Sequence, residues 1–375
     1  MTDFLRHTRN VCKSRYEWRV RQTPGDPVEV ASRLDVLPAV ARALINRGYG
    51  AEPSADKYML SPDIDQLRDP RLMADMDRAV DRLARAVQSG ERILVYGDYD
   101  ADGVCSTAVM ARFLEAVGAS ASAAIPERER EGYGLSEKSL PLIAQTAPQL
   151  IVTVDNGVGA VGAVSALRAM NIDVVVTDHH LPDAVLPDAA AVVDPMRADC
   201  PYPFKGLSGA GVAFQVCRAL ALKLSGGTKR PVKKFQDVLD AVLPLVALAT
   251  VADVMPLTDE NRALVRYGLA LMPASDMPGV RLLATQALRG KPSLRADSVG
   301  YQIGPRINAA GRMGEARTAY DLLRATDEPA AAQLLARLDE LNSQRQRTER
   351  ALTKQAMETV PDPLPAGIVV SGGPD

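Results

Sequence analysis

The stretch RILVYGDYDADGVCS, residues 92–106, joins a short apolar run to a loop rich in aspartate and glycine. Arg92–Tyr96 is predicted to be a buried strand, because the run is short and almost continuously apolar. The loop Gly97–Gly103 then carries three acidic side chains at alternate positions. A helix is predicted over Val104–Val117, so the stretch indicates a strand, a polar loop and a helix in succession.

Four further short apolar runs follow, and helical stretches such as Ala160–Met170 separate most of them. The predicted strands are Ser122–Ile125, Leu150–Val154, Asp173–Thr177 and Ala190–Val193. Strands that are apolar almost throughout and alternate with helices are typical of a parallel sheet covered on both faces. The fold class is therefore α/β, and ligands are expected beyond the carboxyl ends of the strands.

The rest of the chain is predicted to be mainly helical. Residues 1–75 form an N-terminal segment of helices with an edge strand at EWRVRQ, and residues 76–328 form the sheet domain. Within that domain, residues 204–328 are a helical part. Residues 329–360 are a long connecting helix, and residues 361–375 are a proline-rich linker that leads into a new strand.

The composition limits the classes of protein to consider. The chain has 375 residues, of which 47% are apolar and 24% are charged, the balance of a globular protein. Its formal net charge of −2 argues against a protein that binds nucleic acid through overall basic charge. Binding of nucleic acid would have to use a local basic surface or a metal site.

The cysteines and apolar segments indicate a cytoplasmic protein. The four cysteines form no CxxC pair, so neither a zinc site nor a disulfide framework is expected. Reduced thiols are typical of the cytoplasm, and the N-terminus lacks the apolar part of a secretory signal. The longest apolar run, Ala241–Ala252, is too short to span a bilayer and contains Pro244, so no membrane partner is expected.

Acidic residues and histidines follow the predicted strands and one apolar helix. They are Asp98, Asp100, Asp102, Asp155, Asp178, His179, His180 and Asp194, with Asp253 after the helix. Carboxylates that meet at one sheet edge raise one another's pKa unless a cation lies between them. Oxygen ligands with an imidazole favour Mn²⁺ or Mg²⁺, and the acids outnumber the needs of one hydrated ion. The sequence therefore predicts two divalent cations bridged by a carboxylate.

Each part of this set also has a plainer interpretation. A D-x-D-G loop suits a turn or a calcium site, although Val109 stands where an EF-hand needs its closing Glu. An Asp at a strand end is often only a helix cap. The combination is more specific, because two of the three histidines, His179 and His180, stand at a strand end beside two other acidic loops.

Several runs together resemble a known family. The runs VYGDYDADGVCS (95–106), VDNG (154–157), TDHH (177–180) and TVADVMPL (250–257) look like the successive motifs of the DHH phosphoesterase superfamily. Three others are similar to the RecJ family within it: PEREREGYGL (126–135), FKGLSGAGVAF (204–214) and GPRINAAGRMGEA (304–316). This resemblance implies a five-stranded parallel DHH domain and an exonuclease that degrades single-stranded DNA from its 5′ end in DNA repair and recombination. Single-strand-binding protein and a helicase are the protein partners that it implies.

The same resemblance implies roles for individual residues. The metal ligands would be Asp98, Asp100, Asp102, Asp155, His179 and Asp253, and they would hold two Mn²⁺ or Mg²⁺ ions. Asp155 is the candidate for the bridging carboxylate. His180 would touch the scissile phosphate, and Asp178 would orient a ligand histidine from outside the coordination sphere.

Arginines among small residues indicate contact with phosphate. Arg306 and Arg312 flank Asn308 and Gly311, so all three polar side chains are candidates for binding DNA phosphates. The planar guanidinium fork suits two phosphate oxygens, and Arg312 is also assigned to the catalytic set with His180. Surface arginines on a loop are the plainer alternative.

Arg128 and Tyr133 lie on the loop that follows the predicted strand Ser122–Ile125, at the same sheet edge. Both are candidates for contact with DNA, and the Tyr133 ring could stack on a base without sequence preference. An ordinary tyrosine at the rim of the sheet is the alternative.

The resemblance covers only part of the family's length. RecJ proteins continue past the long helix with a DHHA1 domain, which holds a Gly-Gly-His motif, and an OB-type domain. Here GIVVSGGPD (367–375) matches only the first strand of DHHA1, so the chain is expected to be truncated and to fall short of full activity. A DHH phosphodiesterase for oligonucleotides or cyclic dinucleotides, a pyrophosphatase and an inactive binding module are the alternatives.

Overall fold

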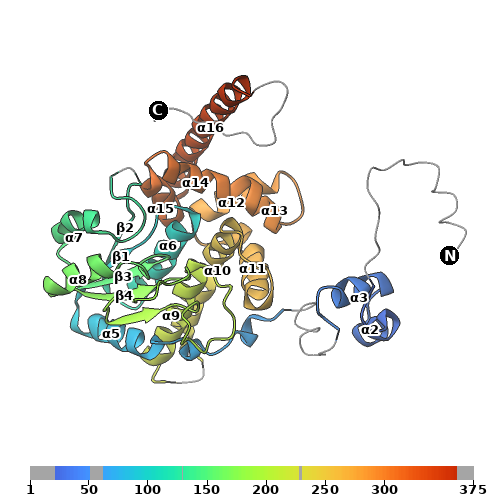
Figure 1. Ribbon diagram of the computed structural model, residues 1–375, viewed down its shortest axis with the longest axis horizontal. Coiled ribbons are helices and arrows are strands. Elements are labelled where there is room, and N and C mark those ends of the chain that lie inside the picture. Colours follow the sequence, from blue (N-terminus) through green and yellow to red (C-terminus); the bar gives the residue numbers. More distant parts are fainter. Residues whose placement is uncertain (1–21, 51–61, 129, 228–229, 361–375) are drawn as a thin grey trace, which may run out of the picture. The chain divides into compact units, whose positions relative to one another are not determined.

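The computed structural model describes residues 22–50, 62–128, 130–227 and 230–360, and Figure 1 shows its elements along the chain. The protein comprises two compact units, Met1–Pro62 and Asp63–Asp375. The edge strand predicted at EWRVRQ lies outside the described residues except for Gln22, and the strand predicted after the linker lies wholly outside them.

The described part of the first unit is a pair of short helices, α2 (Pro27–Leu34) and α3 (Pro38–Ile45). The two helices enclose a small apolar cluster of Val30, Ala31, Ala41 and Ile45. The sequence predicts one helix in this part, over Val36–Arg47, which corresponds to α3, and none at α2. A proline begins each helix, where its missing N–H has no helical partner to lose.

The second unit contains a five-stranded parallel sheet in the order β2-β1-β3-β4-β5. The strands are β1 (Arg92–Tyr96), β2 (Ser120–Ala124), β3 (Leu150–Val154), β4 (Asp173–Thr177) and β5 (Ala191–Val193). The α/β fold class is confirmed. Strands β1, β3 and β4 have the predicted bounds, while β2 begins two residues earlier and β5 one residue later than predicted.

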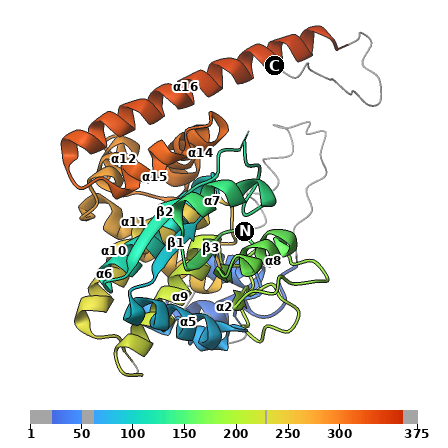
Figure 2. The ribbon, with the colours of Figure 1, turned by 90° about the vertical axis from the view of Figure 1, so that its left-hand side faces the viewer.

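Helices cover both faces of this sheet (Figure 2). In β1, Ile93 and Val95 belong to the apolar layer that contains residues of α5 (Met76–Ser89), α6 (Ala101–Ala116) and α9 (Gly209–Leu224). Leu94 and Tyr96 point to the other layer, with residues of α7 (Leu140–Thr146) and α8 (Val161–Ala169). Burial on both faces explains why these strands are apolar almost throughout.

The helical part of the second unit follows β5. Its elements after α9 are α10 (Lys233–Ala252), α11 (Asp259–Leu271), α12 (Pro278–Leu288), α13 (Ala296–Ser298), a π-helix (Val299–Ile303), α14 (Gly304–Arg312) and α15 (Ala316–Arg324). The long helix α16 (Glu328–Glu358) closes the described chain and packs against α12, α14 and α15. The motif that contains Arg306 and Arg312 is therefore a helix rather than a loop.

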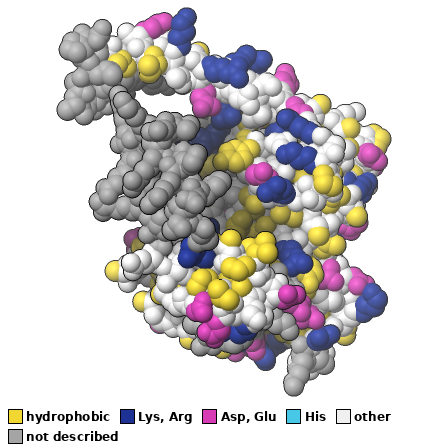
Figure 3. Space-filling model, turned by 90° about the vertical axis from the view of Figure 1, so that its right-hand side faces the viewer, with side chains coloured by type: hydrophobic (Ala, Val, Ile, Leu, Met, Phe, Trp, Pro, Cys, Tyr) yellow, Lys and Arg dark blue, Asp and Glu magenta, His cyan; other side chains and the backbone are white. Residues whose placement is uncertain are grey.

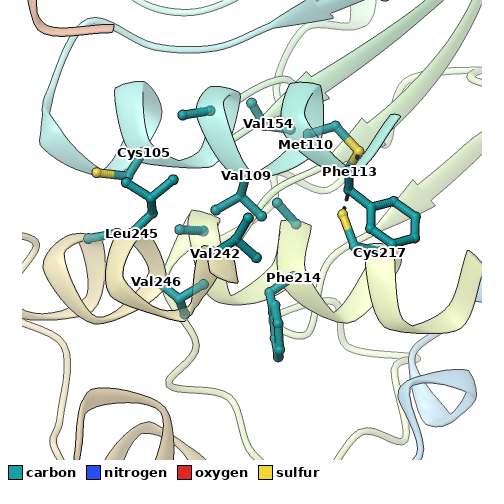
Figure 4. Packing of buried hydrophobic residues seen from close by; sticks show 14 of the residues in the cluster. Cys105, Val109, Met110, Phe113, Val154, Phe214, Cys217, Val242, Leu245 and Val246 are labelled. Carbon is teal, nitrogen blue, oxygen red and sulfur yellow. Dashed lines mark hydrogen bonds between the residues drawn. The ribbon is translucent and has the colours of Figure 1, made fainter. Parts of the chain in front are cut away.

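Helix α10 lies at the centre of this helical part. Its residues Val242 and Val246 share one apolar cluster with Val109 of α6 and Phe214 of α9 (Figure 4). By length and composition α10 could cross a membrane, but 56% of its apolar window is buried inside the protein. Pro244 lies within the helix without ending it, because packing on α6, α9 and α11 holds the backbone despite one lost hydrogen bond.

The segment Asp63–Asp75 packs on the sheet unit. The backbone N–H of Arg68 donates to the Glu260 carboxylate at 2.7 Å. The Asp75 carboxylate accepts from the backbone of Val192, in the edge strand β5, and from Arg197. The compact units accordingly divide after Pro62. The predicted domain boundaries, including the one after residue 75, stay predictions.

Candidate metal centre

The candidate site lies at the carboxyl edge of the sheet, around the His179 imidazole. His179 Nε2 lies 3.0 Å from Asp155 Oδ1 and 3.7 Å from both Asp102 Oδ2 and Asp253 Oδ2. These groups come from the ends of β3 and β4, the first turn of α6 and the end of α10. The structure thus brings four of the six predicted ligands around this nitrogen. Asp102, His179 and Asp253 form one group whose atoms lie close enough to hold a cation, and Asp155, His179 and His180 form another.

The start of α6 determines the position of Asp102. The helix begins at Ala101, three residues earlier than predicted. Asp100 is the N-cap of α6, and its carboxylate accepts from the Gly103 N–H at 2.9 Å. Asp102 therefore lies in the first helical turn, fully buried. Its two carboxylate oxygens accept from the backbone N–H groups of Gly209 and Ala210, both at 2.8 Å. The start of α9 thus holds this carboxylate in one orientation.

Asp155 has a left-handed backbone, with φ of +63°, directly after β3. Its Oδ1 atom is buried and has no hydrogen-bond partner among the described residues, although His179 Nε2 faces it at 3.0 Å. The Leu207 backbone raises the pKa of His179, as an acceptor for ring nitrogen Nδ1 does. With the Nδ1 proton directed to Leu207, Nε2 and Asp155 Oδ1 both present lone pairs, and such a pair fits a cation held by both atoms.

Burial and mutual repulsion perturb the carboxylates of the site. Burial, with repulsion from Asp100, raises the pKa of Asp102 to about 8, of Asp98 to about 7 and of Asp253 to about 6. The pKa of Asp155 is raised well above its ordinary value, first by burial and then by Asp102. A divalent cation would remove the energetic cost of ionising these carboxyl groups side by side, since it offsets the charges that repel one another.

The two adjacent histidines have opposite properties. Burial and the neighbouring His180 lower the pKa of His179 to about 4, so its imidazole is neutral and able to bind a metal. A hydrogen bond to Asp178 is the main reason that the pKa of His180 rises to about 9. His180 Nδ1 lies 2.7 Å from Asp178 Oδ1. In this structure Asp178 therefore orients the ring of His180, and the role predicted for Asp178 beside a ligand histidine stays a prediction.

An aromatic and basic rim lies beside His180. The Tyr133 hydroxyl is 3.1 Å from His180 Nε2, and the two rings meet edge to face. Tyr133 also meets the Tyr99 ring edge to face, and the Arg128 guanidinium lies 5.6 Å from the centre of the Tyr99 ring. Burial raises the pKa of Tyr99, while Arg128 and Arg312 are near enough to lower it. Candidate DNA-binding residues from separate segments thus lie around one side chain, Tyr99.

Two other candidates for phosphate contact already have protein partners. The Arg306 guanidinium binds Asp339 of α16 at 2.7 Å and the backbone carbonyl of Gln302. Asn308 Oδ1 accepts from the Ala101 N–H, at the start of α6, at 2.7 Å. Both residues therefore connect α14 to its neighbours in this structure, and Asn308 supports the acidic loop.

Three acidic candidates lie outside the group around His179. Asp98 is buried and accepts from the Gly134 N–H at 3.3 Å, so it faces the segment that carries Tyr133. Asp100 is half-exposed at the start of α6. Asp194 is buried after β5, and burial raises its pKa to about 7.

Comparison with known proteins identifies the family. The model for the DHH family, N-terminal domain, matches residues 92–250. The single-stranded-DNA-specific exonuclease RecJ of Bacillus subtilis (strain 168) is 36% identical over 348 residues, which cover 92% of this chain and 42% of that protein. A crystal structure of exonuclease RecJ bound to manganese is 37% identical, with a TM-score of 0.69, and the match covers 77% of this chain and 71% of that one. The chain belongs to the RecJ family.

Other RecJ relatives agree with this assignment. The RecJ of Thermus thermophilus is 36% identical over 361 residues, which are 96% of this chain and 50% of that protein. A structure of the Thermus thermophilus RecJ in complex with Mg²⁺ is 33% identical, with a TM-score of 0.68, and the match covers 92% of this chain and 45% of that one. The chain spans about half the length of the curated RecJ relatives that it matches.

The FKGLSGAGVAF motif (204–214) also holds site residues that were not predicted from the sequence. Leu207, Gly209 and Ala210 contact predicted ligands through their backbones. The FKGLSGAGVAF motif supports the resemblance, but small residues gave no chemical reason to assign them a role. Tyr99 was missed because it stands between two acids that offered a stronger chemical interpretation.

Proposed function

We propose that this chain is the catalytic part of a 5′→3′ exonuclease specific for single-stranded DNA, acting in DNA repair and recombination. It would hydrolyse phosphodiesters with two divalent cations, Mn²⁺ or Mg²⁺. One observation carries the proposal: three carboxylates from separate segments, two of them buried, surround a neutral imidazole nitrogen at 3.0–3.7 Å. That observation is made in a chain of the RecJ family, whose solved members include complexes with manganese and magnesium.

The proposed ligands are those whose oxygen and nitrogen atoms converge. Asp102, His179 and Asp253 would hold one cation, and Asp155, which lies beside His179 in a second group of candidate ligands, would share in holding both. Asp100 and Asp98 are the remaining candidates, because they stand beside these residues and supply the charge that a second cation needs. Cations bound here would stabilise charge on phosphoryl oxygens and lower the pKa of an attacking water.

The chain's own residues would bind and orient the substrate. With a pKa of about 9, His180 is an imidazolium at neutral pH and is placed to donate a hydrogen bond to a non-bridging phosphate oxygen. Asp178 would keep that ring in position. Arg312, exposed at the end of α14, would bind a second phosphate oxygen.

The DNA strand would be held by its backbone and by stacking rather than by base edges. Arg128 and Arg312 would contact phosphates on either side of Tyr99, and Tyr133 would stack on a base. Arg306 and Asn308 are weaker candidates for such contact, because Asp339 and Ala101 already bind them. On the face shown in Figure 3, Lys and Arg side chains are interspersed with acidic and hydrophobic ones, which suits local contacts.

The cellular setting follows from the proposed substrate. A cytoplasmic location fits an enzyme that acts on chromosomal DNA, and α10 is a helix of the protein core. Single-strand-binding protein and a helicase are the partners that an exonuclease of this kind needs, because they keep the substrate single-stranded.

Digestion of end-labelled DNA tests the proposal. Single- and double-stranded oligonucleotides with a 5′ or a 3′ label are incubated with the full chain in Mn²⁺, in Mg²⁺ and in EDTA. We expect early loss of the 5′ label from single strands only, and no reaction in EDTA. Hydrolysis of dinucleotides or pyrophosphate with long DNA intact would contradict the proposal in favour of a small-substrate phosphodiesterase. Absence of Mn²⁺ binding would indicate an inactive binding module.

A further inference from the structure

The turn Leu207–Ala210, at the start of α9, contacts three predicted metal ligands at once. The backbone of Leu207 lies near enough to the His179 ring to raise the pKa of that imidazole. The N–H groups of Gly209 and Ala210 donate to the two oxygens of Asp102, each at 2.8 Å. Asp155 is the third ligand, and it packs directly against Gly209.

Gly209 leaves no space between α9 and Asp155. A Cβ atom at residue 209 would lie 2.5 Å from Asp155 Cβ and 2.6 Å from Asp155 Cγ, closer than real Cβ atoms come to other atoms. Its three nearest neighbours would all be side-chain atoms of Asp155. The side chain of Asp155 is confined, because the residue is buried and its backbone has a φ of +63°. Any larger residue at position 209 therefore has to move this carboxylate or α9.

The turn is itself held from three sides. Ser208 caps α9 by accepting from the Gly211 N–H at 3.1 Å, and its hydroxyl is 3.3 Å from that of Thr250 in α10. The Asn261 side chain of α11 donates to the backbone carbonyl of Gly206. The turn thus has little freedom to follow a ligand that moves, and the ligands have to follow the turn.

We propose that Leu207–Ala210 is a rigid template that fixes Asp102, Asp155 and His179 relative to one another and so determines the affinity for divalent cations. Gly209 is its positioning residue, since it sets the distance between α9 and Asp155. This inference rests on the proposed function, because it assigns the turn a part in the same metal site. Backbone groups that orient ligands from outside the coordination sphere commonly contribute to metal affinity in this way.

Calorimetric titration of the full chain with MnCl₂ tests the template. Gly209→Ala should weaken Mn²⁺ binding about 10- to 100-fold, the usual effect of disturbing groups that orient ligands. Gly300→Ala is the control for the glycine-to-alanine change itself, because a Cβ atom there would come no closer than 3.8 Å to any neighbour and would touch no residue of the turn. We expect Gly300→Ala to bind Mn²⁺ as the unmodified chain does.

Gly268→Ala controls for crowding alone. A Cβ atom there would overlap the Leu243 carbonyl, between α11 and α10 and away from the ligands. This variant should unfold at lower temperature than the unmodified chain, while its folded fraction binds Mn²⁺ with unchanged affinity. If Gly268→Ala also lost Mn²⁺ affinity, crowding at any helix contact would have that effect, and the proposed template would be wrong.

A double-mutant cycle measures the contact between residues 209 and 155 in the absence of metal. Asp155→Gly removes the three atoms nearest to the new Cβ, and glycine accepts a φ of +63° without strain. In EDTA, Gly209→Ala should lower the thermal midpoint of the unmodified chain but not that of the Asp155→Gly variant. If Gly209→Ala lowered the thermal midpoint equally in the unmodified chain and in the Asp155→Gly variant, the proposed contact would be wrong.

The two proposals fail in distinguishable ways. If the unmodified chain binds Mn²⁺ and digests DNA but Gly209→Ala binds equally tightly, the template is wrong and the nuclease stands. If the unmodified chain binds no Mn²⁺, the nuclease is wrong, and the cycle in EDTA still decides whether residues 209 and 155 are coupled.

Discussion

The floor and the rim of the candidate site are built differently. The floor consists of Asp102, Asp155 and His179, whose side chains are 1–7% exposed. Backbone groups of other segments hold two of them directly, and Gly209 confines the third. The rim consists of Tyr99, Arg128, Tyr133 and His180, and 52% of Tyr133 is exposed. Side-chain contacts hold the rim, such as the one between Arg128 and Tyr99.

This difference indicates that the floor and the rim have different functions. A buried floor with fixed carboxylates suits cations, because their ligands have to be placed before charge is brought in. An open rim with aromatic and basic groups suits a flexible polymer, because stacking and phosphate contacts tolerate any base sequence. Changes in the floor should therefore remove the reaction, and changes in the rim should weaken substrate binding.

The largest effect is expected at the floor, from Asp155→Asn. Asparagine keeps the shape of the side chain and tolerates a positive φ, but it lacks the charge. Mn²⁺ affinity should fall by more than about 100-fold, beyond the usual effect of an indirect partner, and digestion of single-stranded DNA should fall to background. Titration calorimetry, the end-label assay and circular dichroism measure affinity, activity and fold.

Asp237→Asn is the control for loss of one negative charge. Asp237 lies on α10, is exposed and pairs with Lys233 at 2.8 Å. Its activity should match that of the unmodified chain. Near-normal turnover by Asp155→Asn would remove Asp155 from the metal site.

The floor also predicts how stability depends on pH in the absence of cations. The pKa values of about 8 for Asp102 and about 7 for Asp98 lie above those of an unfolded chain, so the native state binds more protons. The raised pKa of His180, about 9, acts in the same direction above its unfolded value. The stability contributed by these protons is present at low pH and is lost as the pH rises through the folded values.

The thermal midpoint in EDTA should therefore fall by several degrees, about 4 or more, between pH values of roughly 6.5 and 8.5. Saturating Mn²⁺ at the higher pH should restore it. Asp102→Asn should show a shallower fall, because asparagine has no proton to lose. A midpoint that rises with pH over this range in EDTA would contradict the burial of these carboxyl groups.

Between floor and rim, Asp178→Asn should change the properties of His180. The hydrogen bond to Asp178 is the main cause of the raised pKa, so the pKa of His180 in the cation-free chain should fall from about 9 towards its ordinary value. NMR titration of the imidazole signals measures this change. The kcat for single-stranded DNA should fall about 100-fold, as expected when a protonated group is lost. An unchanged His180 titration would mean that Asp178 does not govern that ring.

The smallest effect is expected at the rim, from Tyr133. Tyr133→Ala should raise the KM for single-stranded DNA about tenfold, the size expected for the loss of one stacked base, with little change in kcat. Tyr133→Phe keeps the ring and removes the hydroxyl that faces His180 at 3.1 Å, so its KM should stay near that of the unmodified chain. A loss of kcat without a change in KM would place Tyr133 with the floor.

The strands and the chemical nature of the site could be predicted from the sequence. Strands β1, β3 and β4 have the predicted bounds, because a short, mostly apolar run between polar turns is a local pattern. Asp155 and His179 were identified because acids and imidazoles directly after strands have no apolar role. The start of α6 was missed by three residues, since Asp100 serves both as an acid of the loop and as its N-cap.

The roles of Asn308 and Arg306 could not be predicted in the same way. Both were expected to contact phosphate, yet Asn308 binds the backbone of Ala101 and Arg306 binds Asp339. Their partners are remote in sequence, so no local pattern shows which acceptor or donor each will meet. Leu207–Ala210 was passed over for a similar reason, because its backbone groups act there and the need for glycine at position 209 depends on contact with Asp155, which is remote in sequence.

The sequence by itself determined the five parallel strands, the order of the acidic loops and the chemical preference for divalent cations. Those properties depend on side-chain type and on spacing within a few residues. Only the tertiary structure decided which atoms meet: it made His179 a neutral, buried base and His180 an imidazolium, although the two residues are adjacent. Burial, hydrogen bonding and distance between remote segments fix those differences, and they arise only when the sheet, α6, α9 and α10 pack together.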